Sequence, residues 1–201
     1  MLTEQEKFWQ EEFGDEYTER NKGDSIIAGN IALFAKILAR TGRVRSVLEF
    51  GAGSGNNLKA IKAIMPGVSL SAVEINKKAA QELWSIAYVF GTRSILEWDI
   101  ERPVADLTLS KGLLIHIEPS MLPVAYDALY GASMDYICLV EYYNPTPVEV
   151  PYRGHKGKLF KRDFAGDMLD RYDNLKLVDY GFVYHRDKFK QDDVHWWVLQ
   201  K

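Results

Sequence analysis

The chain has 201 residues, of which 47% are hydrophobic, and a formal net charge of -3. This length and apolar content suit one domain with a sizeable core, so we expect a single unit over residues 1–201. The low, mixed charge excludes a broad basic field for nucleic acid, and no run approaches the ~20 apolar residues of a membrane span. The one cysteine excludes an internal disulfide. The polar N-terminus lacks the apolar stretch of a signal peptide, so we expect a cytoplasmic protein.

The first residues, 1–41, predict a helical cap that precedes an α/β core over residues 42–201. A helix is expected over residues 3–13, with the following glycine as its end, and a second helix over about 24–40. Residues 15–21 between them are polar and show little apolar periodicity. They form either a solvated linker or a lid over a ligand pocket.

An apolar run over residues 46–50 ends in three alternating glycines, Gly51, Gly53 and Gly55, and apolar residues at helical spacing follow. The pattern predicts a strand, a tight loop and a helix. The free N–H groups and positive dipole end of such a helix face an anionic group. A dinucleotide fingerprint would need a glycine at the next position, where the chain has Asn56. The loop therefore indicates a nucleotide cradle of another kind.

A second strand, residues 69–73, ends in Glu74, about twenty residues beyond the glycines. An acidic side chain there can accept hydrogen bonds from both ribose hydroxyls. Ile75 directly after it either packs on a base ring or is an ordinary core residue. The glycine loop and the strand-end carboxylate together predict a bound nucleoside.

The acidic residue and the glycines, in the spacing Glu49-x-Gly51-x-Gly53-x-Gly55, resemble motif I of the class I S-adenosylmethionine-dependent methyltransferases. This resemblance implies S-adenosylmethionine as the cofactor and an α/β, Rossmann-like fold. The expected sheet has seven strands, mostly parallel, with an antiparallel C-terminal hairpin and helices on both faces. The resemblance also implies that the loop wraps the aminocarboxypropyl and ribose parts of the cofactor, with contacts from Glu49, Gly51, Ala52, Gly53, Ser54, Gly55 and Asn56.

A third strand is expected over residues 93–97, after a helix over about 76–89. In class I methyltransferases an acidic residue after the third strand often bonds the adenine amino group. The resemblance places Asp99 there, with Trp98 and Ile100 as apolar neighbours of the ring. A strand-end aspartate is also a routine turn residue, so both roles stay open.

Substrates are expected beyond the carboxyl ends of the parallel strands, at the loops after the fourth and fifth strands. Lys111 follows the fourth strand, residues 105–110, and is expected to contact the cofactor through its backbone. His116 in the same loop suits proton removal from an acceptor, because an imidazole pKa near ~6.5 matches neutral pH. A half-buried structural histidine is the alternative. Tyr142 and Glu141, where the fifth strand ends, are the next candidate bases.

A long loop rich in aromatic, basic and glycine residues follows the fifth strand. Long ordered loops above a rigid sheet commonly bind a ligand. Arg153, His155, Lys156 and Lys158 form a cationic cluster suited to a carboxylate or phosphate on the acceptor, unless the loop is simply solvated. Tyr143 and Asn144 are further candidate acceptor contacts.

The last third of the chain predicts a helix over about 161–172 and strands over 176–185 and 194–199. Two strands joined by a short polar turn are antiparallel. Five β-α units closed by a β-hairpin match the class I methyltransferase topology, whereas a dehydrogenase would continue with parallel strands. No spacing of His, Cys and carboxylate residues indicates a metal site.

Two segments resemble a narrower family, the methylases associated with pseudaminic acid biosynthesis: residues 8–21 and residues 152–164. The resemblance implies that Tyr17, Arg20 and Asn21 contact the cofactor or the acceptor. It further implies methyl transfer to an oxygen or nitrogen of a small anionic or sugar-like acceptor, such as a nonulosonate or surface-glycan precursor. Two other functions stay open: an NAD-type oxidoreductase, and a non-catalytic regulatory module that binds an adenosine nucleoside.

Overall fold

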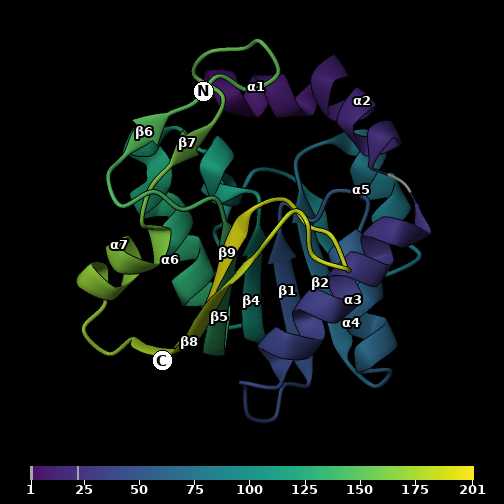
Figure 1. Ribbon diagram of the computed structural model, residues 1–201, viewed down its shortest axis with the longest axis vertical. Helices are drawn as coiled ribbons and strands as arrows, with labels where there is room; N and C mark the ends of the chain where they lie inside the picture. Colours follow the sequence, from purple (N-terminus) through teal and green to yellow (C-terminus); the bar gives the residue numbers. More distant parts are fainter. Residues whose placement is uncertain (1, 22) are drawn as a thin grey trace.

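The computed structural model describes residues 2–21 and 23–201 and shows one twisted sheet between layers of helices (Figure 1). The described strands form a seven-stranded sheet in the spatial order β3-β2-β1-β4-β5-β9-β8. The expected mostly parallel sheet is confirmed. The first five strands in this order, β3, β2, β1, β4 and β5, run parallel to one another, and β9 runs antiparallel to β5 and β8. The strands are β1 (Ser46–Phe50), β2 (Ser69–Glu74), β3 (Tyr88–Thr92), β4 (Ala105–Lys111), β5 (Ser133–Glu141), β8 (Lys176–Val183) and β9 (Val194–Gln200).

Helices cover both faces of the sheet. Leu33, Phe34 and Ile37 of α3 are buried against one face, together with apolar side chains of α4. The apolar sides of α6 and α7 are buried against the other face. The helices are α1 (Glu4–Gln10), α2 (Glu12–Arg20), α3 (Asp24–Leu38), α4 (Asn56–Ile64), α5 (Lys77–Leu83), α6 (Leu122–Ala132) and α7 (Phe164–Arg171), with 3-10 turns at Ile95–Glu97, Leu114–His116 and Pro119–Met121.

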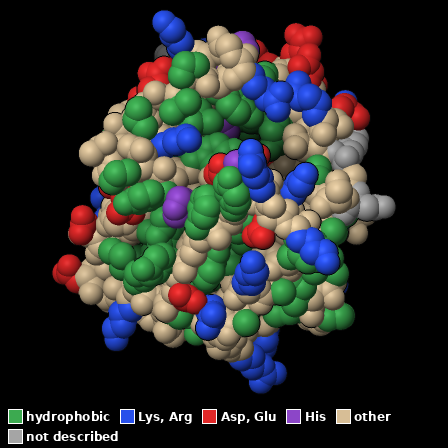
Figure 2. Space-filling model, viewed as in Figure 1, with side chains coloured by type: hydrophobic (Ala, Val, Ile, Leu, Met, Phe, Trp, Pro, Cys, Tyr) green, Lys and Arg blue, Asp and Glu red, His purple; other side chains and the backbone are tan. Residues whose placement is uncertain are grey.

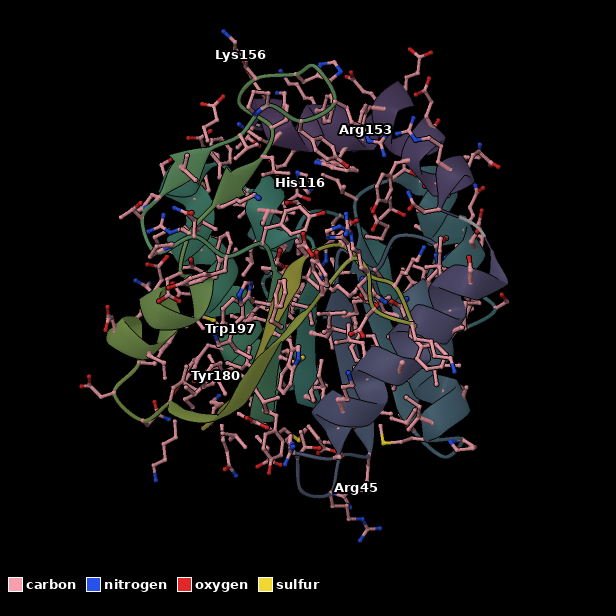
Figure 3. All side chains as sticks on the ribbon, in the orientation of Figure 1. Arg45, His116, Arg153, Lys156, Tyr180 and Trp197 are labelled. Carbon is pink, nitrogen blue, oxygen red and sulfur yellow. The ribbon has the colours of Figure 1, made fainter. Side chains whose placement is uncertain are left out.

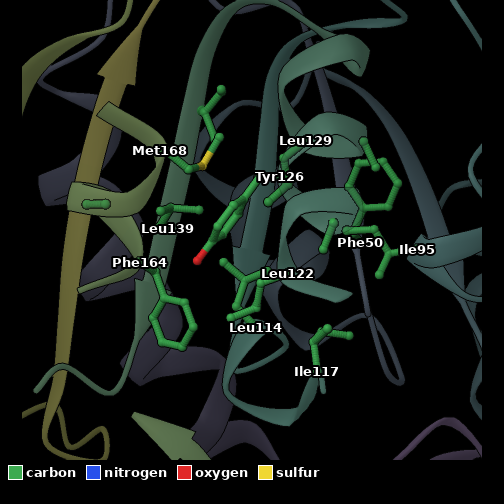
Figure 4. Close-up of a cluster of buried hydrophobic side chains, with 14 of the residues drawn as sticks. Phe50, Ile95, Leu114, Ile117, Leu122, Tyr126, Leu129, Leu139, Phe164 and Met168 are labelled. Carbon is green, nitrogen blue, oxygen red and sulfur yellow. The ribbon is translucent and has the colours of Figure 1, made fainter. Parts of the chain in front are cut away.

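The core follows the alternation of side chains along the parallel strands. Val47 of β1 lies in the cluster with α3 and α4, whereas Leu48 and Phe50 lie in the cluster with α6 and α7. Figure 4 shows Phe50 in this second cluster, with Tyr126 of α6 and Leu139 of β5. A strand that is buried on both faces has apolar residues on both, which explains the continuous apolar run before the glycine loop. This packing fixes the carboxyl ends of the parallel strands at one edge of the sheet.

The N-terminal helices correct one prediction. The sequence predicts a helix that ends at Gly14, but α2 continues through Gly14 to Arg20. Gly14 is buried, and a Cβ on it would lie 1.9 Å from the carbonyl oxygen of Trp9. The glycine therefore permits close contact between α1 and α2 and does not end a helix. Both helices lie over the carboxyl ends of the strands (Figure 1), whereas α3 packs on a face of the sheet.

The third strand also lies earlier than predicted. β3 covers Tyr88–Thr92, where the sequence predicts the end of a helix, and residues 93–97 are not a strand. β3 is an edge strand with half-exposed and exposed residues, so its apolar pattern is weak. Ser94 and Glu97 form a capping box around the 3-10 turn that follows, with the Ser94 backbone N–H donating to Glu97 Oε2 at 3.2 Å.

The loop after β5 contains a small antiparallel ribbon of β6 (Val148–Glu149) and β7 (Phe160–Lys161), which the sequence does not predict. The segment between these strands contacts α1. Gln5 Nε2 donates to the carbonyl oxygen of Gly157 at 3.0 Å, and Lys158 Nζ lies 3.7 Å from a Glu4 carboxylate oxygen. The ribbon therefore braces α1 above the ends of the strands.

Candidate functional site

A first cavity lies at the carboxyl ends of β1, β2 and β4, beneath α1 and α2, and holds about 870 Å³ of space that includes open solvent. Its floor includes Glu74, Ile75 and the backbone of Gly51 and Gly53. Trp9, Tyr17 and Thr18 line it from the covering helices, and Lys111, Leu113 and His116 line it from the end of β4 and the loop that follows. The predicted strand-end acid and glycine loop therefore share one cavity.

Glu74 is buried at the end of β2, and backbone N–H groups hold both of its carboxylate oxygens. Gly53 N donates to Oε2 at 2.7 Å, and Asn76 N donates to Oε1 at 2.8 Å. Burial raises the pKa of the Glu74 carboxyl, and these backbone donors oppose that shift. An ionised carboxylate has about four lone-pair sites, so each oxygen can accept a further hydrogen bond from a diol in the cavity.

The glycine loop presents bare backbone to the site. Gly51, Gly53 and Gly55 have φ values of 69°, 53° and 77°, in the left-handed region that favours glycine. A Cβ on Gly53 would meet no atom within 4 Å, so the cavities are open above this residue. Ala52, Ser54 and Asn56 face a second cavity on the other side of the loop.

Tyr17, Arg20 and Asn21 of the N-terminal segment occupy different places. Tyr17 lines both cavities, and burial raises the pKa of its hydroxyl to about 12. Asn21 lines the second cavity, where its carbonyl oxygen accepts a hydrogen bond from Asn56 Nδ2 at 2.7 Å. Arg20 pairs with Glu16 at 3.0 Å on the helix surface and lines neither cavity.

The residues proposed to flank adenine lie outside both cavities. Trp98 packs edge-on against Phe50, with ring centroids 5.0 Å apart. Asp99 has a side chain that is 77% exposed and pairs with Arg93 at 2.8 Å. Ile100 does not line the cavities either, whereas Ser94, Ile95 and Leu96 do. The shift of the third strand explains this placement, since the turn that meets the cavity comes earlier in the chain.

Three charged residues lie close together below the cavities, at the ends of β1, β4 and β5. Glu49 is fully buried and accepts a hydrogen bond from Asn57 Nδ2 at 2.5 Å, and burial raises its pKa to about 8. Glu141 is also fully buried, and its pKa rises to about 7 for the same reason. Burial lowers the pKa of the Lys111 ammonium, while the charges of Glu49, Asp192 and Glu141 oppose that shift.

Glu141 holds the turn after β4. Its Oε1 accepts hydrogen bonds from Ser110 Oγ at 2.7 Å and from the backbone N–H groups of Leu113 and Leu114 at 3.1 Å. Glu141 lines neither cavity. These contacts make it a positioning residue for the loop that carries His116.

His116 is buried in the wall of the first cavity, against Trp9 and Tyr152. Its Nδ1 lies 2.6 Å from the carbonyl oxygen of Lys158. A carbonyl only accepts, so Nδ1 carries the proton and the neutral ring keeps a lone pair on Nε2. Burial lowers the pKa of His116 to about 4, so the ring is neutral near pH 7. It can accept a hydrogen bond at Nε2, although with a weaker basicity than an exposed histidine.

The second cavity lies between the glycine loop, the first half of α3 and the loop that joins β8 to β9, and encloses about 1720 Å³ of space that includes open solvent. It shares Tyr17, Lys111, Gly51 and Gly53 with the first cavity. Gly55 lines neither cavity, because it packs on Leu83 of α5, 2.8 Å from where its Cβ would lie. Tyr142 OH donates to Asp192 Oδ2 at 2.7 Å, and Asp192 lines this cavity. Burial and this contact raise the pKa of the Tyr142 hydroxyl.

The predicted acceptor contacts lie away from both cavities. Figure 3 shows Arg153 and Lys156 at the outer end of the molecule, beyond His116. The His155 ring packs on Phe8, with centroids 5.0 Å apart. The Tyr143 ring is tilted against the His195 ring, with centroids 5.2 Å apart, and Asn144 Nδ2 donates within its own turn to the carbonyl oxygen of Thr146. The long loop thus contacts α1 and does not bring this cluster to the cavities.

Several lining residues were not predicted from sequence. Trp9 and Leu113 read as ordinary apolar residues, and no local pattern distinguishes a core position from a cavity wall. Residues 185–192, which line the second cavity, read as a polar turn. Their charges were visible, but only the tertiary fold places this turn beside α3.

The described residues contain neither a metal-binding cluster nor a membrane-spanning helix. No cluster of three or more His, Cys, Asp or Glu side chains there has the geometry to hold a metal ion. None of the described helices has both the length and the apolar character needed to cross a membrane.

Comparison with known proteins identifies the fold. No family model and no curated protein matches the sequence. Among solved structures, the chain is similar to 1,6-didemethyltoxoflavin-N1-methyltransferase from Burkholderia thailandensis with bound S-adenosylhomocysteine, with a TM-score of 0.68, 15% identity, and coverage of 94% of this chain and 83% of that chain.

Two further solved structures agree. Magnesium protoporphyrin IX methyltransferase from Synechocystis with bound S-adenosylhomocysteine gives a TM-score of 0.66 at 12% identity, covering 98% of this chain and 97% of that one. The N-methyltransferase NodS from Bradyrhizobium japonicum gives 0.64 at 13% identity, covering 89% of this chain and 97% of that one. At such identities the likeness concerns the fold alone. The chain has the Rossmann-like fold of the class I methyltransferases.

Proposed function

We propose that the protein transfers a methyl group from S-adenosylmethionine to an oxygen or nitrogen of a small-molecule acceptor. The observation that carries this proposal is the pair formed by buried Glu74 and Gly53 at the floor of the first cavity. A carboxylate with free acceptor sites suits the ribose hydroxyls, and the bare backbone beside it lets the ligand lie close. The structural neighbours with bound cofactor or cofactor product support the same proposal.

The residues present fit an adenosine group. Gly53 leaves open space where a side chain would stand, and Ile75, Ile95 and Leu113 offer apolar walls for a base. Trp9 of α1 adds an aromatic wall to this cavity. When bound, S-adenosylmethionine supplies an already activated methyl group.

The work left to the chain is to align the acceptor and to take up its proton. Orientation of two reacting groups can supply ~7–11 kcal/mol of the barrier. His116 is the first candidate proton acceptor, because its Nε2 lone pair is held free by the bond from Nδ1 to the Lys158 carbonyl. Tyr142 is the second candidate, since its hydroxyl bonds a carboxylate at the second cavity. Glu141 serves to position the His116 loop.

The acceptor we propose is a sugar or nonulosonate precursor of a surface glycan. The resemblance of residues 8–21 and 152–164 to the methylases associated with pseudaminic acid biosynthesis supports this narrower assignment. Two of the neighbouring enzymes are named for chemically unrelated substrates, a didemethyltoxoflavin and a magnesium protoporphyrin, so the fold itself leaves the acceptor open.

Titration calorimetry with S-adenosylmethionine, S-adenosylhomocysteine and NAD tests the proposal. We expect both adenosyl compounds to bind and NAD to bind far more weakly. Tighter binding of NAD would favour the oxidoreductase alternative. Turnover of S-adenosylmethionine with a panel of nonulosonate intermediates then separates an enzyme from a regulatory module, because a module would bind the cofactor without forming a methylated product.

A further inference from the structure

The β8–β9 loop, which forms the roof of the second cavity, is held in place by specific contacts. Gln191 Nε2 of the β8–β9 loop donates to Asn30 Oδ1 of α3 at 2.9 Å. A Cβ on Gly29 would lie 2.7 Å from the backbone oxygen of Lys190, so the glycine lets the loop touch the helix. At the other side Tyr142 OH bonds Asp192 at 2.7 Å. These contacts tie the loop to α3 and to the residue that follows β5.

The charged groups around this cavity are mainly cationic. Lys111 lies at the floor, and Lys188 and Lys190 come from the roof. Within the described part of the chain, neither Lys188 nor Lys190 forms an ion pair or a side-chain hydrogen bond, whereas the charges of Glu49, Asp192 and Glu141 act on Lys111. The one carboxylate of the lining, Asp192, already accepts the Tyr142 hydroxyl. Figure 2 shows Lys and Arg side chains gathered around the hollow on this face of the molecule.

The lining also contains neutral polar side chains. Ser25, Ser54 and Asn56 line the second cavity, together with Gln191 of the roof. Hydroxyl and amide groups can both donate and accept hydrogen bonds, which suits the hydroxyl groups of a ligand. Cationic and neutral polar side chains thus occur in the same wall.

We propose that the second cavity binds the acceptor and that it selects a polyhydroxylated small molecule carrying a carboxylate or phosphate, held by Lys188 and Lys190 above and by Lys111 below. The assignment rests on the proposed methyl transfer, and it is supported by the contact between the two cavities, which share Tyr17, Lys111, Gly51 and Gly53 in their linings. It moves acceptor recognition from the Arg153, His155 and Lys156 cluster to the β8–β9 loop.

Calorimetry on protein saturated with S-adenosylhomocysteine tests the proposal with two matched pairs of probes. One pair is N-acetylneuraminate and its methyl ester, and the other is N-acetylmannosamine 6-phosphate and N-acetylmannosamine. We expect at least one charged member to bind about tenfold more tightly than its neutral partner, the equivalent of ~1.4 kcal/mol. The pair that shows the preference distinguishes carboxylate from phosphate. Equal affinity within both pairs, or binding of neither charged probe, would overturn the proposal.

Two double variants with the same loss of charge locate the site. Lys188→Gln with Lys190→Gln should reduce the preference to about threefold or less, because a charge-assisted hydrogen bond loses its donor. Arg153→Gln with Lys156→Gln removes equal charge outside the cavities and should keep the preference. The opposite pattern contradicts the proposal. If the wild type does not bind S-adenosylhomocysteine, methyl transfer itself fails, and the same probe pairs on the unliganded protein still test the anion site.

Discussion

The two cavities differ in how the chain builds them. The first is formed by strand ends and by turns directly after them, so Glu74, Gly53 and Leu113 each follow or end a strand of the parallel sheet. The second is closed by α3 and the β8–β9 loop, whose contact residues Asn30 and Gln191 are 161 positions apart. Local sequence order therefore determines the proposed donor side, whereas tertiary packing determines the proposed acceptor side.

The difference has a chemical counterpart. The first cavity has aromatic and aliphatic walls around one buried carboxylate, which suits a base and a ribose. The second has lysines, amides and a hydroxyl-bound aspartate, which suits a polar anionic ligand. Lys111 and Tyr17 belong to both linings and mark the junction where donor and acceptor would meet. Substitutions that alter one cavity and leave the other unchanged therefore test these two proposed roles most directly.

The largest effect is expected at the first cavity. Glu74→Ala removes the proposed ribose acceptor and frees two backbone donors, so S-adenosylhomocysteine should bind about 5- to 150-fold more weakly, from a loss of ~1–3 kcal/mol. Calorimetry measures the change. Asp99→Ala is the matched control, because Asp99 is exposed and pairs only with Arg93 among the contacts of the described chain. Equal loss in both variants would show that the strand-end carboxylate has no special role.

A second effect concerns the shared floor beneath both cavities. The raised pKa of Glu49, about 8, means that folding favours the protonated carboxyl. Its stabilising contribution is complete below the unfolded pKa of ~4.3 and is lost as pH rises through about 8. Glu49→Gln should therefore raise the melting temperature relative to wild type increasingly between pH 5 and pH 9, by about 2–4 °C for each kcal/mol relieved.

Thermal melts across this pH range measure the difference between the two proteins. Glu101→Gln, at an exposed position, removes the same charge and should leave the pH dependence unchanged. A Glu49→Gln variant whose melting temperature stays parallel to wild type at every pH would show that the carboxyl is ionised in the folded state.

The third test acts on the roof of the second cavity. Gly29→Ala places a methyl group 2.7 Å from the Lys190 backbone oxygen, so the β8–β9 loop must move. We expect faster amide hydrogen exchange over residues 188–192, weaker binding of the charged probe, and an affinity for S-adenosylhomocysteine within about threefold of wild type. Gly131→Ala in α6, where a Cβ would meet nothing within 4 Å, is the control. Unchanged hydrogen exchange of the loop in Gly29→Ala would contradict the close contact between Gly29 and the β8–β9 loop.

The smallest effect is expected at the hydroxyl that holds the loop from β5. Tyr142→Phe removes the 2.7 Å bond to Asp192 and should cost about 0.5–1.5 kcal/mol of stability, toward the lower end because Asp192 is exposed and can be hydrated. Denaturant unfolding measures this loss of stability.

Turnover by Tyr142→Phe and His116→Ala, measured side by side, identifies the proton acceptor. Only substitution of the residue that accepts the proton should lower kcat without weakening cofactor binding.

Most of the sheet was predictable because its signals are local. The apolar run before Gly51, the acid at the end of β2 and the polar turn before β9 each indicate an element from adjacent residues. The errors occurred where tertiary contact overrides the local pattern. Gly14 serves close contact with Trp9 inside a helix pair, and β3 is an edge strand whose exposed positions hide its alternation.

The sequence predicted several residues of the first cavity and did not predict the lysines that line the second. Glu74 and the glycine loop lie at the first cavity, and Tyr17 and His116 line it as well. The cationic segment after β5 has suitable composition, yet Arg153, His155 and Lys156 line neither cavity, and Lys156 points outward at the end of the molecule (Figure 3). Composition cannot show on which side of a covering helix a loop will fold. Lys188 and Lys190 could not be predicted as cavity residues, because the sequence shows only a polar hairpin turn. They line a cavity because the tertiary fold places this turn beside α3.

The bond between Asn30 and Gln191 also bears on the order of events during synthesis. The ribosome makes the glycine loop and β2 early, but α3 must wait for a partner that emerges 161 residues later. Release of a nascent chain before that point leaves a half-walled groove. Closure of this groove, the proposed acceptor site, therefore requires that the β8–β9 loop has already been synthesised and has packed on α3.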